Sequence, residues 1–599
     1  MNRILVGALI VAGGLAVCGR VPAREVVFRP IPLDGSLTNG QLISLGGTGV
    51  YTNTYPDTFG HIPFLLLTTN LNGAGVPVGQ VEAPVTNGPL PSYFEANPGI
   101  VGWTTNHFAF FCNGQWATTF TNAVGGESGH AENVANDFYG RWFGVATNVS
   151  HVNLYDAASF NNSFINSGLA VTDRVVNQSY TFTSYNSGAD QNFDNSAYNY
   201  NVLYVTAAGL TGGSVNTPAT CYNGIAVGVY NAANSPTGPT VDGRCKPDLT
   251  AWANQAPATS YSAPVVAGAA AVLIQAALRG DGGANTNAAT DIRTIKALLL
   301  NGAVKPPGWS NNSLHPLDYT YGAGIVNLLN SYEQLAGGQH AYSSSATGDP
   351  GTPFPPSLPL PGITQTADSS GLLRGWDFNV ITNDYTADGF NDYYFALTNS
   401  PAGGSTFTAT LVWNRMPNWW YPNVLWLNLY NADTGVLVTN SVSYIDNVQH
   451  VYIPSLPAGN YDLQVCKSSV YMDTLADTYA LAYESFAVAA QTVASGTNMV
   501  LSWPLYPSGF SLQGTTNLTS PNWVNVTNPT PVIVQGQYQL TIPDFNPAAL
   551  SYVTVTNIGA TGNPSPGGGG GPVVTNIITV PIYNENMDLH YFRLVRPNF

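Results

Sequence analysis

A serine stands near the start of a predicted helix, where its hydroxyl could act as a nucleophile. Pro264 follows Ser260 closely, and proline is tolerated in the first turn of a helix. The residues that then recur at helical spacing are apolar: Val265, Ala269, Val272, Leu273 and Ala276. Just before such a helix, unpaired backbone N–H groups stabilise the negative charge that develops when a hydroxyl attacks a carbonyl group. The pattern favours a catalytic serine over an idle residue at the helix start.

The residues around this serine resemble the serine motif of the subtilases, the family of subtilisin-like serine proteases. The segment reads Ala258-Thr-Ser260-Tyr-Ser-Ala-Pro264-Val-Val-Ala-Gly268, and Ala258 stands where the family has glycine. Upstream, Gly238–Leu249 resembles the segment that precedes the family's serine. The resemblance extends over residues 71–338. It implies an acid, a histidine and a serine, in that order, that hydrolyse peptide bonds through an acyl-enzyme.

A histidine is expected in the first turn of another helix. The residues that recur at positions i, i+3, i+4 and i+7 after it are Ala131, Val134, Ala135 and Phe138. The segment Ser128–Ala135 resembles the family's histidine segment, with Ala131 and Glu132 in place of the usual Gly and Thr. The resemblance implies that His130 is the general base.

The third member of the triad is a glutamate in this chain. Gly73–Val81 resembles the subtilase strand that ends in the triad aspartate, and Glu82 occupies the position of that aspartate. It would lie at the carboxyl end of a parallel strand, where the sites of α/β proteins gather. A glutamate can orient a histidine through Nδ1–H, although its extra methylene requires a shift of backbone or imidazole. The alternatives are a solvated or capping role for Glu82, with Asp57 as a distant substitute.

One departure from the family concerns the second donor that stabilises the oxyanion. Subtilases carry an asparagine after Ala-Ala-Gly, whereas Ala207-Ala-Gly209 is followed here by Leu210, which has no donor. In subtilisin, loss of that donor costs roughly 10²–10³ in kcat. The backbone N–H of Ser260 would remain, and Asn216 and Asn223 are candidate replacements.

The elements that must position these residues alternate between short β-type runs and helical patterns. Strands are predicted at Val76–Val81, Arg174–Ser179, Val202–Ala208 and Gly224–Val229, and helices at Gly129–Tyr139, Ala263–Arg279 and Asp291–Asn301. Such alternation favours the α/β class, with a parallel sheet and helices on both of its faces. Within this order, Val176–Ser179 resembles the subtilase strand that binds extended substrate.

The rest of the chain is predicted to be β-structure. The proline-rich segment 349–362 indicates a domain boundary. Beyond it, Ser405–Trp413 alternates apolar and polar residues, which predicts a β-sandwich of jelly-roll type. A second all-β unit opens with Met499–Trp503 and closes with Tyr591–Val595. The expected order is a signal peptide (1–23), an irregular or short pro-segment (24–70), the catalytic domain (71–338), a linker (339–362), the sandwich (363–487) and a small β-domain (488–599).

Composition and the first residues limit the partners and the compartment. The net charge of −16 argues against a nucleic-acid partner, because nucleic-acid binders need a basic surface. After Arg3, the apolar run Ile4–Val17 is too short to span a bilayer and suits a signal peptide that is cleaved after Ala23. We therefore expect a secreted or cell-surface protein with no membrane span after cleavage. Lipidation of Cys18 or retention as a membrane anchor are the alternatives.

The expected chemistry requires no cofactor. The resemblance allows structural calcium, which binds hard oxygen ligands, but no spacing names a metal site. Export permits disulfides, and the pair that we expect is Cys221 with Cys245. The other cysteines after cleavage are Cys112 and Cys466.

These sequence features are compatible with three functions. The presence of all three triad-type side chains favours an active extracellular endopeptidase that cleaves a protein or peptide substrate. Leu210 and the altered residues beside His130 favour a pseudoprotease that binds protein or glycan through its cleft or its β-domains. In the third, the α/β domain is a scaffold within a surface or adhesion protein. The sequence indicates neither the subsite preference nor the oligomeric state.

Overall fold

The computed structural model describes residues 70–486 with short gaps, together with separate strands on either side. The gaps are at residues 84–89, 91, 210–211, 231, 233–234, 254–255, 307, 358–361, 369–370, 399–403 and 471–473. Before residue 70, only β1 (Leu42–Ser44) and β2 (Val50–Thr52) are described, as an antiparallel pair. The predicted signal peptide, Asp57, Leu210 and the linker residues 358–361 lie outside the described residues. The predicted domain boundaries stay predictions.

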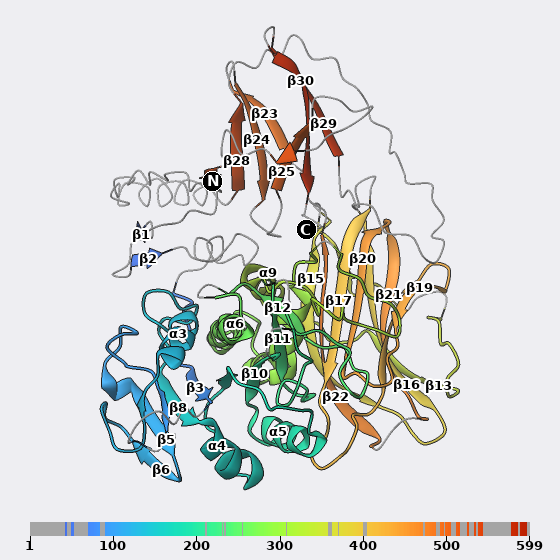
Figure 1. The fold of residues 1–599 in the computed structure, drawn as a ribbon. Helices are drawn as coiled ribbons and strands as arrows, with labels where there is room; N and C mark the ends of the chain where they lie inside the picture. The colour runs from blue at the N-terminus through green and yellow to red at the C-terminus, as the bar shows by residue number, and fades with distance from the viewer. Residues whose placement is uncertain are drawn as a thin grey trace, which may run out of the picture. The chain divides into compact units, whose positions relative to one another are not determined.

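An eight-stranded sheet forms the centre of the α/β part (Figure 1), in the order β12-β11-β10-β9-β3-β8-β5-β6. Its strands pair in parallel, except that β5 and β6 are antiparallel. In chain order they are β3 (Pro77–Glu82), β5 (Phe108–Cys112), β6 (Gln115–Ala117), β8 (His151–Asp156), β9 (Val175–Gln178), β10 (Leu203–Ala207), β11 (Ile225–Val229) and β12 (Leu249–Ala251). The predicted α/β class with its parallel sheet is confirmed.

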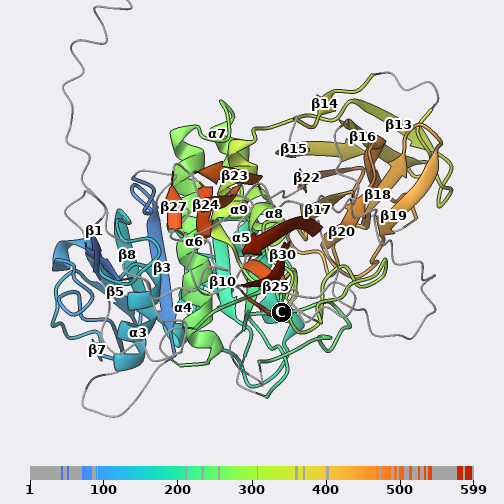
Figure 2. The same cartoon turned by 90° about the horizontal axis from the view of Figure 1, so that it is seen from above.

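One long apolar helix, α6 (Thr259–Arg279), packs against β9, β10 and β11 (Figure 2). Its length and composition would suffice to cross a membrane, but 83% of the apolar stretch is buried inside the protein, as in a core helix. The remaining helices are α3 (Gly129–Phe138), α4 (Ala157–Phe160), α5 (Ser187–Tyr200), α7 (Thr286–Ala289), α8 (Ile292–Asn301) and α9 (Leu328–Ala336). Of these, α3, α7, α8 and α9 lie against α6. A small parallel pair, β4 (Tyr93–Glu95) and β7 (Gly126–Glu127), precedes α3.

The order of the strands places a topological switch point at β3. The strands that come next in the chain, β5 and β8, lie on one side of β3, whereas β9 to β12 lie on the other. In such sheets, ligands bind outside the carboxyl ends of the strands that flank the switch. Glu82 ends β3 and Ser179 directly follows β9, so both lie at this edge.

Two antiparallel sheets form the sandwich (Figure 1). One contains β13 (Ser344–Gly348), β14 (Gln365–Thr366), β16 (Asp388–Leu397), β18 (Leu425–Asn431), β19 (Val436–Ser441) and β21 (Gly459–Lys467), with β14 parallel to β16. The other contains β15 (Leu373–Thr382), β17 (Ser405–Trp413), β20 (Val448–Leu456) and β22 (Ala476–Phe486). The apolar side of β17 lies in the sandwich core, as the alternation predicts: Phe407, Ala409, Leu411 and Trp413.

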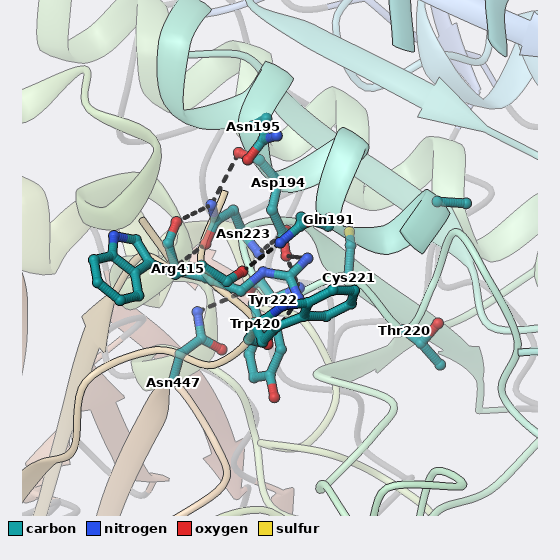
Figure 3. Close-up of polar contacts among 12 residues, drawn as sticks. Gln191, Asp194, Asn195, Thr220, Cys221, Tyr222, Asn223, Arg415, Trp420 and Asn447 are labelled. Carbon is teal, nitrogen blue, oxygen red and sulfur yellow. Dashed lines mark hydrogen bonds and ion pairs between the residues drawn. The ribbon is translucent and has the colours of Figure 1, made fainter. Parts of the chain in front are cut away.

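The sandwich packs directly on the α/β part, because α8 lies against β17 and β22. The hydroxyls of Thr408 and Thr410, on the polar side of β17, donate to Asn301 Oδ1 at 2.9 and 3.0 Å. Arg415, just after β17, forms a buried ion pair of 2.6 Å with Asp194 of α5 (Figure 3). Both faces of β17 are therefore buried.

The last part of the chain forms two further four-stranded sheets, as the predicted second β-unit requires. The first contains β23 (Gln491–Ser495), β24 (Asn498–Pro504), β27 (Val532–Val534) and β28 (Gln537–Ile542). The second contains β25 (Ser511–Thr515), β26 (Val524–Asn525), β29 (Ile577–Asn584) and β30 (Met587–Val595).

The predicted disulfide is wrong, since Cys221 and Cys245 are both free, buried thiols. The two cysteines face different surroundings. The sulfur of Cys221 lies against Gly224, whereas the backbone N–H of Cys245 donates to Asp446 Oδ1 of the sandwich at 2.9 Å. Burial raises the pKa of Cys221 to about 12, so this thiol stays protonated and unreactive.

Candidate active site

Glu82 and His130 are in direct contact. Oε2 of Glu82 lies 2.6 Å from Nδ1 of His130. The glutamate side chain is 2% exposed and that of the histidine is 40% exposed. A buried carboxylate on Nδ1 fixes the ring and leaves Nε2 free to exchange a proton.

Two residues that the sequence analysis did not single out hold the glutamate in place. Nε2 of Gln80 donates to Glu82 Oε1 at 2.7 Å and to the carbonyl oxygen of Ala131 at 2.9 Å. The hydroxyl of Tyr139 in turn donates to Gln80 Oε1 at 2.6 Å. Gln80 and Glu82 are two positions apart on β3, so their side chains share one face of the sheet. That spacing was visible in the sequence, whereas the contact with Tyr139 spans 59 positions.

The histidine owes its position to the start of α3. Ser128 caps this helix, because its hydroxyl accepts a hydrogen bond from the N–H of Ala131. His130 is the second residue of the helix and so lies in its first turn, as predicted. The apolar side of α3 is buried with the predicted residues: Ala131, Val134, Ala135 and Phe138.

Ser260 lies inside α6, whose first residue is Thr259, and not just before the helix as expected. Two contacts hold the start of this helix, and one of them replaces a missing helical bond. Pro264 has no N–H to donate to the carbonyl oxygen of Ser260, and the hydroxyl of Ser179 donates there instead at 2.8 Å. Thr259 Oγ1 donates to the carbonyl oxygen of Gly209 at 2.6 Å. The nucleophile candidate is thus fixed between the ends of β9 and β10.

The residue next to Ser260 also touches the histidine. The ring of Tyr261 lies 5.6 Å from that of His130, centroid to centroid, with a tilt of 41°. The structure therefore brings Glu82 and His130 into contact and places the start of α6 beside them. No hydrogen bond joins His130 to Ser260 in the part of the chain that the structure describes. Catalytic hydrogen bonds often tighten only when substrate is bound.

The electrostatic surroundings favour a charged imidazole. The hydrogen bond to Glu82 raises the pKa of His130 above its ordinary value of 6.5, although burial acts in the opposite direction. Nearby, burial followed by the Glu127 side chain raises the pKa of Glu132 to about 7. Groups with such pKa values can exchange protons near neutral pH, which suits acid–base chemistry.

The two candidate replacements for the missing oxyanion donor, Asn216 and Asn223, lie in different surroundings. Asn223 is buried at the contact with the sandwich, where its Nδ2 donates to the carbonyl oxygens of Asp194 and Arg415 at 3.1 and 3.0 Å. Its Oδ1 accepts from the N–H of Arg415 at 2.8 Å, as Figure 3 shows. Asn223 therefore cannot serve the site, and that expectation is wrong. Asn216 is half-buried, and Leu210 lies outside the described residues.

Within the described ranges, no group of three or more His, Cys, Asp or Glu side chains could hold a metal ion. The site combines the carboxylate of Glu82 in contact with the imidazole of His130, and the hydroxyl of Ser260 at the start of α6. Proton transfer and nucleophilic attack are the chemistry that such groups can perform.

The sheet and its switch point define the class, an α/β protein with Glu82, Ser179 and the start of α6 at the carboxyl edge of its sheet. The model of the subtilase family matches residues 128–324, which include His130 and Ser260 but not Glu82. This match confirms the resemblance over residues 128–324.

Solved structures that match part of this chain include a subtilisin-like enzyme. A cold-adapted subtilisin-like serine proteinase is 20% identical, and the match covers 43% of this chain and 89% of that one at a TM-score of 0.30. A protease from Pseudoalteromonas arctica is 17% identical over 44% and 91% of the two chains, at 0.30. Tripeptidyl peptidase 2 is 12% identical over 65% of this chain and 44% of its own, at 0.28. No curated protein matches this chain.

Proposed function

We propose that this protein is a secreted serine endopeptidase with a Glu82-His130-Ser260 triad. The Ser260 hydroxyl attacks a peptide carbonyl while His130 Nε2 takes its proton. His130 then protonates the leaving amine, an acyl-enzyme remains on Ser260, and water releases it. Glu82 fixes the histidine tautomer and stabilises the imidazolium.

The observation that carries the proposal is the 2.6 Å contact between buried Glu82 and half-exposed His130. If Glu82 were only a solvated carboxylate at the edge of the sheet, its side chain would not be buried against Gln80 and the imidazole of His130. The early start of α6 supports the role of Ser260, because the first N–H groups of a helix have no helical partners. The N–H of Ser260 is in this set and can face an oxyanion.

With Leu210 in place of an amide donor, the oxyanion would depend mainly on this backbone N–H. We therefore expect a slow enzyme relative to subtilases that have both donors. The proposed substrates are extracellular proteins or peptides in extended conformation, laid beside β9. Export follows from the predicted signal peptide.

The alternative is a catalytically weak or inactive protein that binds protein or glycan, which Leu210 favours. Incubation of the purified chain with an unfolded protein substrate separates the two proposals. An endopeptidase yields new internal peptide ends, and Ser260→Ala abolishes them. If Ser260→Ala still yields these products, Ser260 is not the nucleophile that forms them. If a folded, processed chain yields none at all, the binding function becomes the better account.

A further inference from the structure

The loop between β17 and β18, residues 416–422, exposes three consecutive aromatic side chains. Trp419, Trp420 and Tyr421 are 39%, 61% and 68% exposed. Aromatic rings contribute strongly to cores and interfaces when they are buried, so rings left in water at adjacent positions mark a binding surface. We call this segment the aromatic loop.

The backbone of the aromatic loop is held by side chains of α5 (Figure 3). Gln191 Nε2 donates to the carbonyl oxygen of Trp419 at 2.8 Å. Asn195 makes two bonds to Asn418. Its Oδ1 accepts from the backbone N–H at 2.9 Å, and its Nδ2 donates to the side-chain Oδ1 at 3.2 Å. These bonds fix the backbone of the loop without using its aromatic rings.

The sandwich holds the same loop from its other side. Nη1 of Arg415 donates to the carbonyl oxygen of Trp420 at 3.2 Å, and Arg415 is itself fixed by its ion pair with Asp194. Just after the loop, Trp413 Nε1 donates to the carbonyl oxygen of Asn423 at 2.7 Å. A surface whose backbone is already ordered loses little conformational entropy when a ligand binds. The loop thus presents three exposed rings on a fixed backbone.

The surface around the rings carries no charge in α5 and in the aromatic loop, both of which the structure describes in full. The loop contains no charged residue, and the two acidic residues of α5, Asp190 and Asp194, are buried. Gln191, Asn192 and Asn195 are half-buried on α5. A side-chain amide has two N–H donors and two acceptor positions, so these residues can bond to a ligand as well as to the loop.

These properties favour a neutral sugar polymer as the ligand. A sugar ring has faces of C–H groups, which pack on aromatic rings, and a rim of hydroxyl groups, which bond to amides. Tryptophan and tyrosine also anchor proteins at membrane surfaces, where lysine and arginine strengthen the binding to anionic lipids. Neither cation is exposed in the loop or in α5, and the net charge of −16 opposes binding to anionic lipids and anionic polymers.

We propose that the aromatic loop and the exposed side of α5 form a binding site for neutral polysaccharide. Trp419, Trp420 and Tyr421 supply faces on which sugar rings pack, and Gln191 and Asn192 bond to the sugar hydroxyls. The site holds the protein on surfaces that contain such polymers. It does not depend on the proposed catalysis, because none of these residues belongs to the proposed triad.

The test measures binding of the full chain carrying Ser260→Ala, which excludes self-digestion, to four insoluble neutral polysaccharides: cellulose, chitin, curdlan and starch. Depletion of the protein from the supernatant gives Kd. We expect binding to at least one of the four, with Kd about tenfold weaker in Trp420→Ala and weaker still when Trp419→Ala is added. Trp142→Ala removes a tryptophan of comparable exposure, 48%, after α3 and should bind like the parent.

Failure of the parent chain to bind any of the four polysaccharides would overturn the proposal, as would equal binding by the parent and the double variant. Thermal unfolding shows whether the variants fold, and Tyr421→Ala carries the same comparison if Trp420→Ala does not. Sedimentation with phosphatidylcholine vesicles, with and without phosphatidylglycerol, tests the membrane alternative. Vesicle binding that the double variant loses, without binding to polysaccharide, would assign the loop to membranes and overturn the proposal. Because the binding assay uses Ser260→Ala, a failure of the proposed catalysis leaves its result unaffected.

Discussion

The hydroxyl of Ser179 donates to the carbonyl oxygen of Ser260 at 2.8 Å, where Pro264 leaves the helix without a donor. The end of the proposed substrate strand is thereby tied to the proposed nucleophile. The position of Ser260 depends on a side chain from another element and not only on its own helix.

Removal of this tie should lower activity. We expect Ser179→Ala to reduce kcat/KM by roughly tenfold, because a buried carbonyl loses a hydrogen bond of about 1 kcal/mol and the serine loses its restraint. Steady-state kinetics on a peptide substrate measure the effect. Ser331→Ala removes a similar bond in α9, at 2.9 Å from Asn327 O, and should leave kcat/KM unchanged. Equal losses in both variants would point to general destabilisation.

The pH dependence should report the Glu82–His130 pair. His130 must be neutral to accept a proton, so kcat/KM should fall as the pH drops through its pKa, which is raised above 6.5. In Glu82→Gln the charge is lost, and the acid limb should move to lower pH. The remaining activity should be roughly 10⁴-fold lower, as when a triad carboxylate is replaced by its amide.

Glu132→Gln is the control for this profile, because the pKa of Glu132 is also raised, to about 7. Its acid limb should stay with that of the parent. If the acid limb shifted in Glu132→Gln and stayed unchanged in Glu82→Gln, the assignment of Glu82 as the triad carboxylate would be contradicted.

Gln80 should affect catalysis because it positions Glu82, and it should have little effect on substrate binding. We expect Gln80→Leu to lower kcat by about tenfold or more with little change in KM, since Glu82 loses the donor at 2.7 Å that restrains it. Tyr139→Phe removes only the outer bond of this chain and should have a smaller effect. A change confined to KM would assign Gln80 a different role.

Restoration of the amide at position 210 should speed the reaction. We expect Leu210→Asn to raise kcat by up to about 10²-fold, because an amide donor can stabilise the oxyanion in the transition state. Leu210→Gln, whose amide is displaced by one methylene, is the matched control. Equal rates for all three proteins would show that position 210 does not face the oxyanion.

The ion pair between α5 and the sandwich should contribute to global stability. Arg415→Ala leaves Asp194 buried without its partner at 2.6 Å and should cost about 3–5 kcal/mol of unfolding free energy. Arg279→Ala breaks an exposed pair with Asp281 and should cost no more than about 1 kcal/mol. Denaturant titration compares the two. Similar small costs would mean that the contact with the sandwich is weak.

Local patterns were sufficient for most of the fold. Helical and alternating periodicities predicted β3, β9, β10, α3 and β17 to within about one residue at most of their ends, because these patterns reflect which side of each element is buried. Motif order predicted which residues to examine as the triad. The contact of Glu82 with His130 agrees with that choice.

What the sequence did not reveal depends on contacts between distant segments. Ser260 lies inside α6 because Ser179 supplies a donor from 81 positions away. The side chain of Asn223 lies at the contact with the sandwich, because the backbone N–H of Arg415, 192 positions later, donates to its amide oxygen. Cys221 and Cys245 lie near one another in the chain, but sequence separation does not reveal which way each thiol points.

The most direct test of the central claim is the reaction of the purified, processed chain with a fluorophosphonate probe, followed by mass-spectrometric location of the adduct. Our account predicts labelling at Ser260, its loss in Ser260→Ala, and much slower labelling in Glu82→Gln. A folded chain that remains unlabelled, or one labelled at another residue, would contradict the assignment of Ser260 as a nucleophile activated by His130 and Glu82.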